Sequence, residues 1–156
     1  MFEVDIVTEP PNMELKAIGV VRSDIKQPLK RGWEDVVAEV VVDAGLTEAL
    51  EGLEDFSHII VLYWMHRLDE SKDMPLKVHP MGDRELPLTG RFATRAPSRP
   101  NPIGQATVAL LERRGNVLKV KGLDAIDGTP VIDIKPYIPG YDSAANARAA
   151  RWMPKH

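Results

Sequence analysis

The sequence predicts an all-β fold, a small β-barrel with short peripheral helices. Two runs, 36–42 (VVAEVVV) and 59–65 (IIVLYWM), are rich in β-branched and aromatic residues, which favour buried strands. The second run is expected to be fully buried, on both of its faces. A hairpin is predicted further on, with strands 107–112 and 117–121 on either side of a turn at 114–116 (RGN). The chain lacks the strand–helix alternation and the G-x-G-x-x-G motif of a doubly wound nucleotide-binding sheet. These observations leave a barrel or a sandwich as the architecture.

The other predicted strands are short and are separated by polar segments. Residues 15–21 (LKAIGVV) form the first strand, and residues 131–134 (VIDI) form the last. Residues 23–32 make a polar loop with three basic side chains. Prolines forbid long elements between residues 69 and 89, because each proline removes a backbone N–H donor. Strands of this length, with few helices between them, fit the barrel prediction.

Two short helices are predicted outside the barrel. Thr47 can cap a helix over 47–53 whose leucines lie on one face. Asp142 or Ser143 can cap an alanine-rich helix over 144–152. Both segments are too short to form a helical layer of their own, so we expect them at the periphery.

The length of the chain, 156 residues, suits one domain with one hydrophobic core. Residues 1–14 are expected to form an N-terminal extension, and residues 15–156 to form the barrel domain. No apolar run is long enough to span a membrane, and no charged-then-apolar leader begins the sequence. We therefore expect a cytoplasmic protein that does not contact a membrane.

Charge and side-chain chemistry exclude several classes of protein. The formal net charge is −3, so any contact with nucleic acid requires a local basic patch. The absence of cysteine excludes disulfides, thiolate metal sites and cysteine nucleophiles. The four histidines lack the spacing of metal ligands, so we expect no metal.

The segment 90–104 (GRFATRAPSRPNPIG) is the clearest functional signal. Three prolines exclude a helix and disfavour a central strand, which predicts a long, stiff loop that displays its three arginines. Guanidinium groups bind phosphates, carboxylates and the faces of bases. A stiff loop also loses less entropy when it binds a ligand. We therefore expect Arg95 and Arg99 to face a ligand.

Four separated motifs carry a family resemblance. They are FSH at 56–58, MHR at 65–67, FATR with NPIG between 92 and 104, and DGTPVIDIKPY at 127–137. Their order and wording resemble the TsaA-like (TrmO) family, over roughly residues 15 to 140. The motifs are long, and therefore far more specific than a lone glycine fingerprint.

The resemblance implies an activity. TsaA-like proteins are S-adenosylmethionine-dependent methyltransferases that act on N6 of a threonylcarbamoylated adenosine beside the tRNA anticodon. Their fold is a small β-barrel rather than the Rossmann type, and they commonly work as homodimers, so tRNA and a second copy are the expected partners. Bacterial relatives often read Pro-Arg-Gln where this chain has Ile25-Lys26-Gln27. They also often carry an additional C-terminal domain, whereas this sequence ends soon after Trp152.

The resemblance further implies where S-adenosyl-L-methionine binds. The cofactor contacts are expected from Ile25, Lys26, Gln27, Met65, His66, Arg67, Arg95, Gln105, Leu123, Asp124, Asp127, Gly128 and Thr129. A carboxylate can help by taking a proton from the acceptor nitrogen, and Asp133 and Asp127 are predicted for that catalytic role. RNA contacts are predicted from Lys30, Arg31 and Arg99.

Several of these residues have a structural alternative. Asp127-Gly128 is a common turn pair, and Asp133 can lie on the solvent face of a strand. His66 can be a hydrogen-bonded residue at the end of a strand. His79, in a loop flanked by proline, is open to either interpretation.

Other side chains near the motifs are also open to two interpretations. Arg91 can pair with Asp83 or Glu85 instead of facing a ligand. Tyr63 and Trp64 are expected in the core or at a subunit interface, although either ring can stack on adenine.

Two rival functions remain open from the sequence. One is a module that binds S-adenosylmethionine without catalysis, as a sensor. The other is a plain RNA-binding barrel, whose RNA affinity would depend steeply on salt and need no cofactor. Such a barrel needs aromatic stacking platforms, and this chain has only 6% aromatic residues, which disfavours it.

Overall fold

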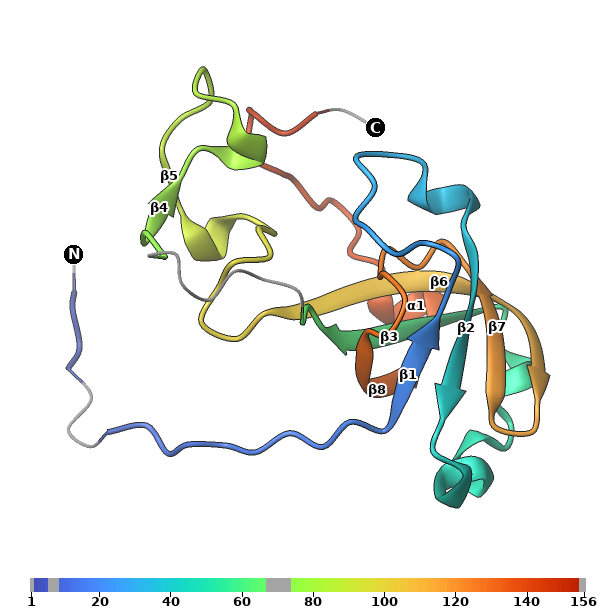
Figure 1. The fold of residues 1–156 in the computed structure, drawn as a ribbon. Coiled ribbons are helices and arrows are strands. Elements are labelled where there is room, and N and C mark those ends of the chain that lie inside the picture. Colours follow the sequence, from blue (N-terminus) through green and yellow to red (C-terminus); the bar gives the residue numbers. More distant parts are fainter. Residues whose placement is uncertain (1, 6–8, 67–73, 155–156) are drawn as a thin grey trace.

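A six-stranded antiparallel β-barrel forms the centre of the computed structural model, which describes residues 2–5, 9–66 and 74–154 (Figure 1). The strands are β1 Gly19–Arg22, β2 Val37–Val42, β3 His58–Trp64, β6 Ile103–Arg114, β7 Val117–Lys121 and β8 Pro130–Pro136. They close in the order β1-β2-β7-β6-β3-β8, with every neighbouring pair antiparallel. The all-β barrel prediction is confirmed.

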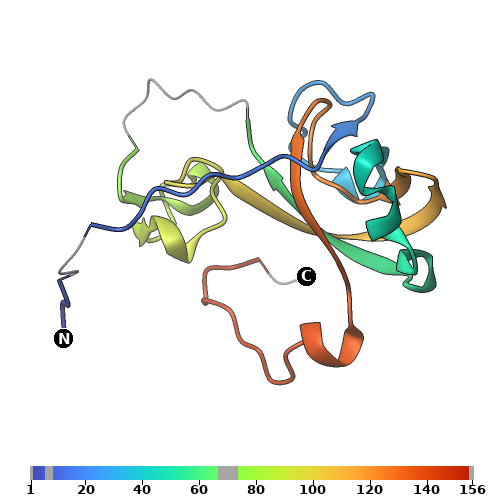
Figure 2. The ribbon, with the colours of Figure 1, turned by 90° about the horizontal axis from the view of Figure 1, so that it is seen from below.

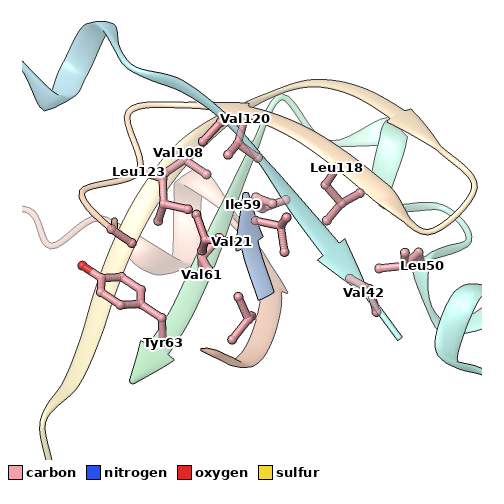
Figure 3. Packing of buried hydrophobic residues seen from close by; sticks show 14 residues of the cluster. Val21, Val42, Leu50, Ile59, Val61, Tyr63, Val108, Leu118, Val120 and Leu123 are labelled. Atoms are coloured by element: carbon pink, nitrogen blue, oxygen red, sulfur yellow. The ribbon is translucent and has the colours of Figure 1, made fainter. Parts of the chain in front are cut away.

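The barrel strands alternate between the inner and the outer face. In β3, Ile59, Val61 and Tyr63 are buried, whereas the residues between them are only partly buried. The prediction that residues 59–65 form a strand buried on both faces is therefore wrong, because a strand of a closed barrel has one inner and one outer face. The inner side chains pack into one cluster, with Tyr63 at one end and Leu50 at the other (Figure 3).

The predicted hairpin is confirmed as β6 and β7, joined at Gly115, whose φ of 56° suits glycine. β6 begins at Ile103, earlier than predicted, and pairs with β3 along the whole of β3. The Met65 N–H, just after β3, donates to the Pro102 carbonyl at 2.8 Å. The end of the arginine-rich segment is thereby held against the end of β3.

Residues 74–102, here called the arm, lie outside the barrel. The arm contains the two-stranded sheet of β4 (Lys77–Val78) and β5 (Thr89–Gly90), with the short 3-10 helices η4 (Pro80–Gly82) and η5 (Arg91–Ala93). Figures 1 and 2 show it beside the barrel, beyond the paired ends of β3 and β6. The described part of the predicted irregular segment, 74–89, confirms that no long element forms there.

The helix predicted over 47–53 is wrong in type and in position. The structure has a 3-10 helix η2 at Ala44–Leu50, followed by η3 at Leu53–Asp55. Asp43 caps η2 by accepting from the Gly45 N–H at 2.9 Å, whereas the Thr47 hydroxyl donates to the Ala44 carbonyl. A third 3-10 helix, η1, covers Trp33–Asp35.

The helix predicted over 144–152 is not formed. The only α-helix in the described part of the chain is one turn, α1 at Pro139–Asp142, and the expected capping residues close that turn. The Asp142 carboxylate accepts from the Ile138 N–H, and the Ser143 hydroxyl donates to the Pro139 carbonyl. Residues 144–151 are exposed, so they have no apolar face whose burial could stabilise a helix.

Candidate functional site

A cavity of about 280 Å³ lies where the end of β3, the arm and the segment before β8 meet. Ligand pockets in proteins typically start near this size, at about 300 Å³. Its walls are mostly apolar and aromatic, with a few convergent polar groups. The lining residues are Pro28, Trp33, Tyr63, Met65, His66, Arg95, Pro97, Asp124, Ala125, Ile126 and Thr129.

Tyr63 joins the barrel core to this cavity. Its ring packs directly on Gly104, since a Cβ at that glycine would lie 2.2 Å from the Tyr63 Cε2 atom. Its hydroxyl donates to the Asp124 carboxylate at 2.6 Å. Burial raises the pKa of the Tyr63 hydroxyl, and the hydrogen bond and the negative charge of Asp124 raise it further. Tyr63 therefore stays protonated and holds Asp124 at the cavity wall.

His66 carries an unsatisfied polar atom. Its Nδ1 is buried and has no hydrogen-bond partner among the described residues. A Cβ built on Gly128 would lie 4.0 Å from its Nε2, so the ring packs beside the turn before β8. Buried ring nitrogens are normally paired, and an orphan in a cavity wall indicates a ligand or an ordered water.

The turn before β8 has the geometry that the Asp-Gly pair predicts. The Thr129 N–H donates to the Ile126 carbonyl at 3.3 Å, and Gly128 has a φ of 80°. Asp127 accepts from the Ser23 N–H at 2.9 Å and pairs with Lys26 at 2.8 Å. These contacts tie the turn to the polar loop after β1, which brings both segments to the same end of the barrel.

The three arginines of the arm differ in their surroundings. Arg91 is buried and donates to the carbonyls of Pro75 and Ser98, and the alternative of a pair with Asp83 or Glu85, both among the described residues, does not form. Arg99 is half-buried, donates to the carbonyls of Thr94 and Ala96, and lies 5.9 Å over the Phe92 ring.

Arg95 is the exposed member of the three, and its side chain lines the cavity. The other two arginines therefore hold the shape of the arm, because their donors satisfy loop carbonyls, and they leave Arg95 to meet a ligand.

The structure brings together five of the residues expected to contact the cofactor. They come from three separate parts of the sequence and line one cavity. They are Met65, His66, Arg95, Asp124 and Thr129. Gly128 adjoins them through His66.

The remaining predicted site residues lie elsewhere. Gln105 and Asp133 both pair with Leu62, so they lie in one row on the outer face of the barrel. Asp133 accepts from the Ile134 N–H and lies 3.3 Å from Lys135. Leu123 is fully buried in the core.

The predicted residues of the loop after β1 lie beside the cavity wall rather than in it. The Ile25 carbonyl accepts from the Asp127 N–H, and Gln27 is exposed next to the lining residue Pro28. Lys30 and Arg31 are exposed in the same loop. Arg67 lies outside the described residues.

Sequence reasoning did not select several lining residues. Trp33 and Pro28 come from the loop between β1 and β2, and Ala125, Ile126 and Pro97 complete the apolar wall. Trp33 could have been selected from the sequence, because it directly follows a polar, basic loop. A tryptophan at such a position lies outside the predicted strands, and its ring is therefore a candidate for contact with a ligand.

The arrangement suits an organic ligand with both polar and apolar parts. Its aromatic and thioether side chains can pack against a flat ring. Among the polar groups, Asp124 offers carboxylate acceptors, Arg95 offers a positive charge and His66 offers a ring nitrogen. Within residues 2–5, 9–66 and 74–154, no three His, Asp or Glu side chains cluster in a way that could hold a metal ion. In the same residues, no helix has the length and apolar character needed to cross a membrane.

Known proteins are similar to this chain along most of its length. A probable S-adenosyl-L-methionine-binding protein of Archaeoglobus fulgidus is 46% identical over 140 residues, which are 87% of this chain and 37% of that protein. Another, from Methanothermobacter thermautotrophicus, is 44% identical over 135 residues, which are 84% of this chain and 94% of that protein. The chain therefore spans little more than a third of one relative and nearly all of the other.

A solved structure and a family model agree with these relatives. The crystal structure of TrmO from Pseudomonas aeruginosa has a TM-score of 0.73 and 33% identity, and the match covers 92% of this chain and 62% of that chain. The family model described as the tRNA-methyltransferase O N-terminal domain matches residues 22–143. The resemblance seen in the sequence motifs is confirmed, and the chain belongs to the tRNA-methyltransferase O N-terminal domain family.

Proposed function

We propose that this protein is an S-adenosylmethionine-dependent methyltransferase acting on N6 of a threonylcarbamoylated adenosine beside a tRNA anticodon. The observation that carries the proposal is the cavity in which residues of three distant family motifs meet. Relatives named as S-adenosyl-L-methionine-binding proteins and the similarity to TrmO support it.

The cavity fits S-adenosyl-L-methionine by the chemistry of its walls. Trp33 and Met65 can contact the flat adenine, and Asp124 can accept from hydroxyl or ammonium groups. Arg95 can pair with the carboxylate of the cofactor, a planar and bidentate interaction. The orphaned Nδ1 of His66 is the observation that favours a polar ligand here over an empty apolar void.

The bound cofactor supplies an activated methyl group, so the protein has mainly to orient groups. Tyr63, held on Gly104, fixes the Asp124 carboxylate, and Arg91 and Arg99 hold the backbone from which Arg95 extends. The catalytic roles of Asp127 and Asp133 stay predictions. Asp127 is already engaged by Ser23 and Lys26, and Asp133 lies on the outer face of the barrel.

The RNA is proposed to run along the polar loop after β1. Lys30 and Arg31 are exposed there. Lys26 borders a groove of about 450 Å³ that Arg22, Arg114 and Lys119 also line. Asp24 and Glu39 line it too, and Glu39 pairs with Arg22, so the groove has a modest excess of positive charge. Arg99 stays a predicted RNA contact, although its Nη1 already donates to two loop carbonyls.

A homodimer with the cofactor cavity near the subunit boundary is part of the proposal. Closed two-fold dimers are the commonest oligomers, and the family resemblance favours one. Leu76 and Leu88 of the arm are 79% and 56% exposed. They belong to the same segment as the cavity residues Arg95 and Pro97, and a second copy would bury them. Light scattering at micromolar concentration should give the mass of two chains, and a mass of one chain would contradict this part.

A second candidate function is binding of S-adenosylmethionine without catalysis. The names of the Archaeoglobus fulgidus and Methanothermobacter thermautotrophicus relatives favour it, since those two names specify binding alone. The deciding measurement is transfer of labelled methyl to tRNA whose adenosine already carries the threonylcarbamoyl group. Tight cofactor binding without labelled tRNA would favour the sensor.

Replacement of one arginine tests the cofactor cavity. Arg95→Ala should weaken S-adenosylmethionine binding by roughly 1.5–3 kcal/mol, a typical contribution of hydrogen bonds to charged groups. Its folding stability should stay within about 0.5 kcal/mol, because the side chain is exposed. Calorimetry of the folded variant measures the affinity, and an unchanged affinity would remove Arg95 from the site.

The RNA surface is tested by charge removal. A Lys30→Ala, Arg31→Ala variant should bind tRNA more weakly and lower the log–log salt slope by about one unit per lost phosphate contact. Its cofactor affinity should match wild type. Equal tRNA binding and methylation by both proteins would leave the activity in place and move the RNA surface elsewhere.

A further inference from the structure

A second and larger cavity, of about 790 Å³, opens between the arm and the C-terminal segment. Its walls are mostly apolar. Two of the lining residues are aromatic, Phe92 of the arm and Trp152 of the C-terminal segment. Phe92 is 79% exposed. The chain after α1 returns to the arm to place Trp152 there, as the path of the C-terminal segment in Figures 1 and 2 shows.

This cavity adjoins the candidate cofactor cavity. Arg95 and Pro97 line both of them, so the two spaces share a wall. The polar groove beside β1 and β2, in contrast, shares no lining residue with the cofactor cavity.

Methyl transfer is an in-line displacement, in which the acceptor nitrogen must come within about 3–3.5 Å of the methyl carbon. The acceptor must therefore enter from a space that opens onto the cofactor. We propose that the arm cavity is the pocket for the modified nucleobase of the RNA, with Phe92 and Trp152 as its stacking platform. This inference rests on the proposed function and names the part of the site that receives the acceptor.

The lining chemistry fits a flat, neutral base. Aromatic side chains stack on nucleobases without regard to sequence, because every base has a π face. The Arg99 guanidinium, 5.9 Å over the Phe92 ring, adds a positive charge and limits the orientations of that ring. An RNA base drawn out of its stack would find apolar surface here, which costs less than exposure of the unstacked base to water.

His79 supplies the proton acceptor in this pocket. Its Nδ1 lies 2.8 Å from the Leu86 carbonyl, an acceptor only, so Nδ1 carries the proton and Nε2 keeps its lone pair in the neutral ring. During transfer the acceptor nitrogen bonds to the methyl carbon, and the carbon–sulfur bond breaks with its electron pair staying on sulfur. The proton of the acceptor nitrogen passes to His79 Nε2 and then to water.

Charge and continuity favour a nucleobase over a second copy of the chain as the occupant. The pocket joins the cofactor cavity through a cationic wall at Arg95, and Arg99 stands over its aromatic platform. A base attached to a polyanionic backbone complements the charge of Arg99, which hydrogen bonds to neutral loop carbonyls do not neutralise, whereas a purely apolar subunit contact offers no negative charge.

The test is binding of N6-threonylcarbamoyladenosine, as the free nucleoside, to protein saturated with S-adenosylhomocysteine. Phe92→Ala and Trp152→Ala should each weaken nucleoside binding by about 10- to 100-fold, the range expected for a lost stacking contact. Trp152→Phe should restore most of the affinity. The affinity for S-adenosylhomocysteine should stay within about twofold, because neither residue lines the cofactor cavity.

Leu111→Ala is the matched control, an exposed apolar residue of β6 that lines neither cavity, and it should change neither affinity. Unchanged nucleoside binding in the Phe92 and Trp152 variants, or no binding by wild type, would overturn the pocket. Conversion of a wild-type dimer to monomer by those variants would also overturn it, since the cavity would then be a subunit contact.

His79→Gln separates chemistry from binding. We expect methyl transfer to tRNA to slow by about 100-fold or more, while nucleoside binding and cofactor affinity stay at wild-type values. Equal rates would remove the proton-acceptor role. Nucleoside binding that depends on Phe92 and Trp152 in a protein that labels no tRNA would support the pocket and contradict the proposed enzyme.

Discussion

The barrel and the arm of this molecule are held together by different interactions. Inside the barrel, fully buried residues such as Ile59 and Leu118 pack into one apolar cluster. In the described part of the arm, the buried residues are Pro80 and the charged Arg91, while Met81 and Phe92 are 69% and 79% exposed. Folding free energy is therefore concentrated in the barrel, while the surfaces free to meet a ligand are concentrated in the arm.

The reason lies in what each region can bury. Each fully buried valine, leucine or isoleucine in the barrel contributes about 1.5–3 kcal/mol. The arm has no such cluster among its described residues, and its shape depends on guanidinium groups that satisfy backbone carbonyls. Each of those bonds contributes about 1.5–3 kcal/mol, as much as one buried side chain, but the described arm has four of them, whereas the barrel cluster has 14 buried residues.

The largest expected effect comes from emptying the barrel core. Leu118→Ala should lower the free energy of unfolding by about 2–5 kcal/mol, because it leaves a cavity in a closed cluster. Phe92→Ala, the arm counterpart, should change it by less than about 0.5 kcal/mol. Urea unfolding of both variants measures the contrast, and similar losses in the two would mean that the arm carries core stability.

Gly104→Ala tests the junction between the two regions. The new methyl group would lie 2.2 Å from the Tyr63 ring, which must move or tilt. We expect a loss of about 1–3 kcal/mol in stability, as for overpacked cores, together with weaker cofactor binding because Asp124 loses its positioned donor. Gly90→Ala is the control, since its added methyl group meets no atom within 4 Å. If Gly104→Ala bound the cofactor with wild-type affinity, Tyr63 would have no role in positioning Asp124 for the cofactor.

Arg91→Met should affect the arm and spare the barrel. The variant keeps the apolar stem but loses the bonds to the Pro75 and Ser98 carbonyls. We expect faster proteolysis within the arm and a loss in cofactor affinity of about tenfold, the equivalent of one charged hydrogen bond, with unchanged melting of the barrel. Hydrogen exchange resolved by segment measures the two regions separately. Loss of protection in β3 or β7 would contradict the view that the arm and the barrel are stabilised independently.

Tyr63→Phe gives the smallest effect and a pH signature. Below about pH 10 the variant should be less stable than wild type by about 1 kcal/mol, since the bond to Asp124 is lost. Burial raises the pKa of Tyr63, so the unfolded chain ionises first, and the advantage of wild type is present below about pH 10 and declines as the pH rises further. Denaturation at pH 8 and pH 10.5 measures this, and a constant difference would contradict it.

Local patterns in the sequence were enough to predict the strands of the barrel. β-branched runs and the Gly115 turn define strands and a hairpin through local conformational preference, and all six strand predictions overlap the observed strands. The Asp127-Gly128 turn was readable for the same reason. The helix over 144–152 failed because propensity does not form a helix without a face to bury.

Tertiary structure decided which polar residues meet. The family resemblance could nominate Met65, His66, Arg95, Asp124 and Thr129, but only barrel closure brings β3, the arm and the turn before β8 to one cavity. It also decided that Asp133 lies on the outer face, because strand register sets which face a side chain occupies. Burial and hydrogen-bond partners depend on contacts between residues far apart in the chain, and no local pattern of residue types specifies them.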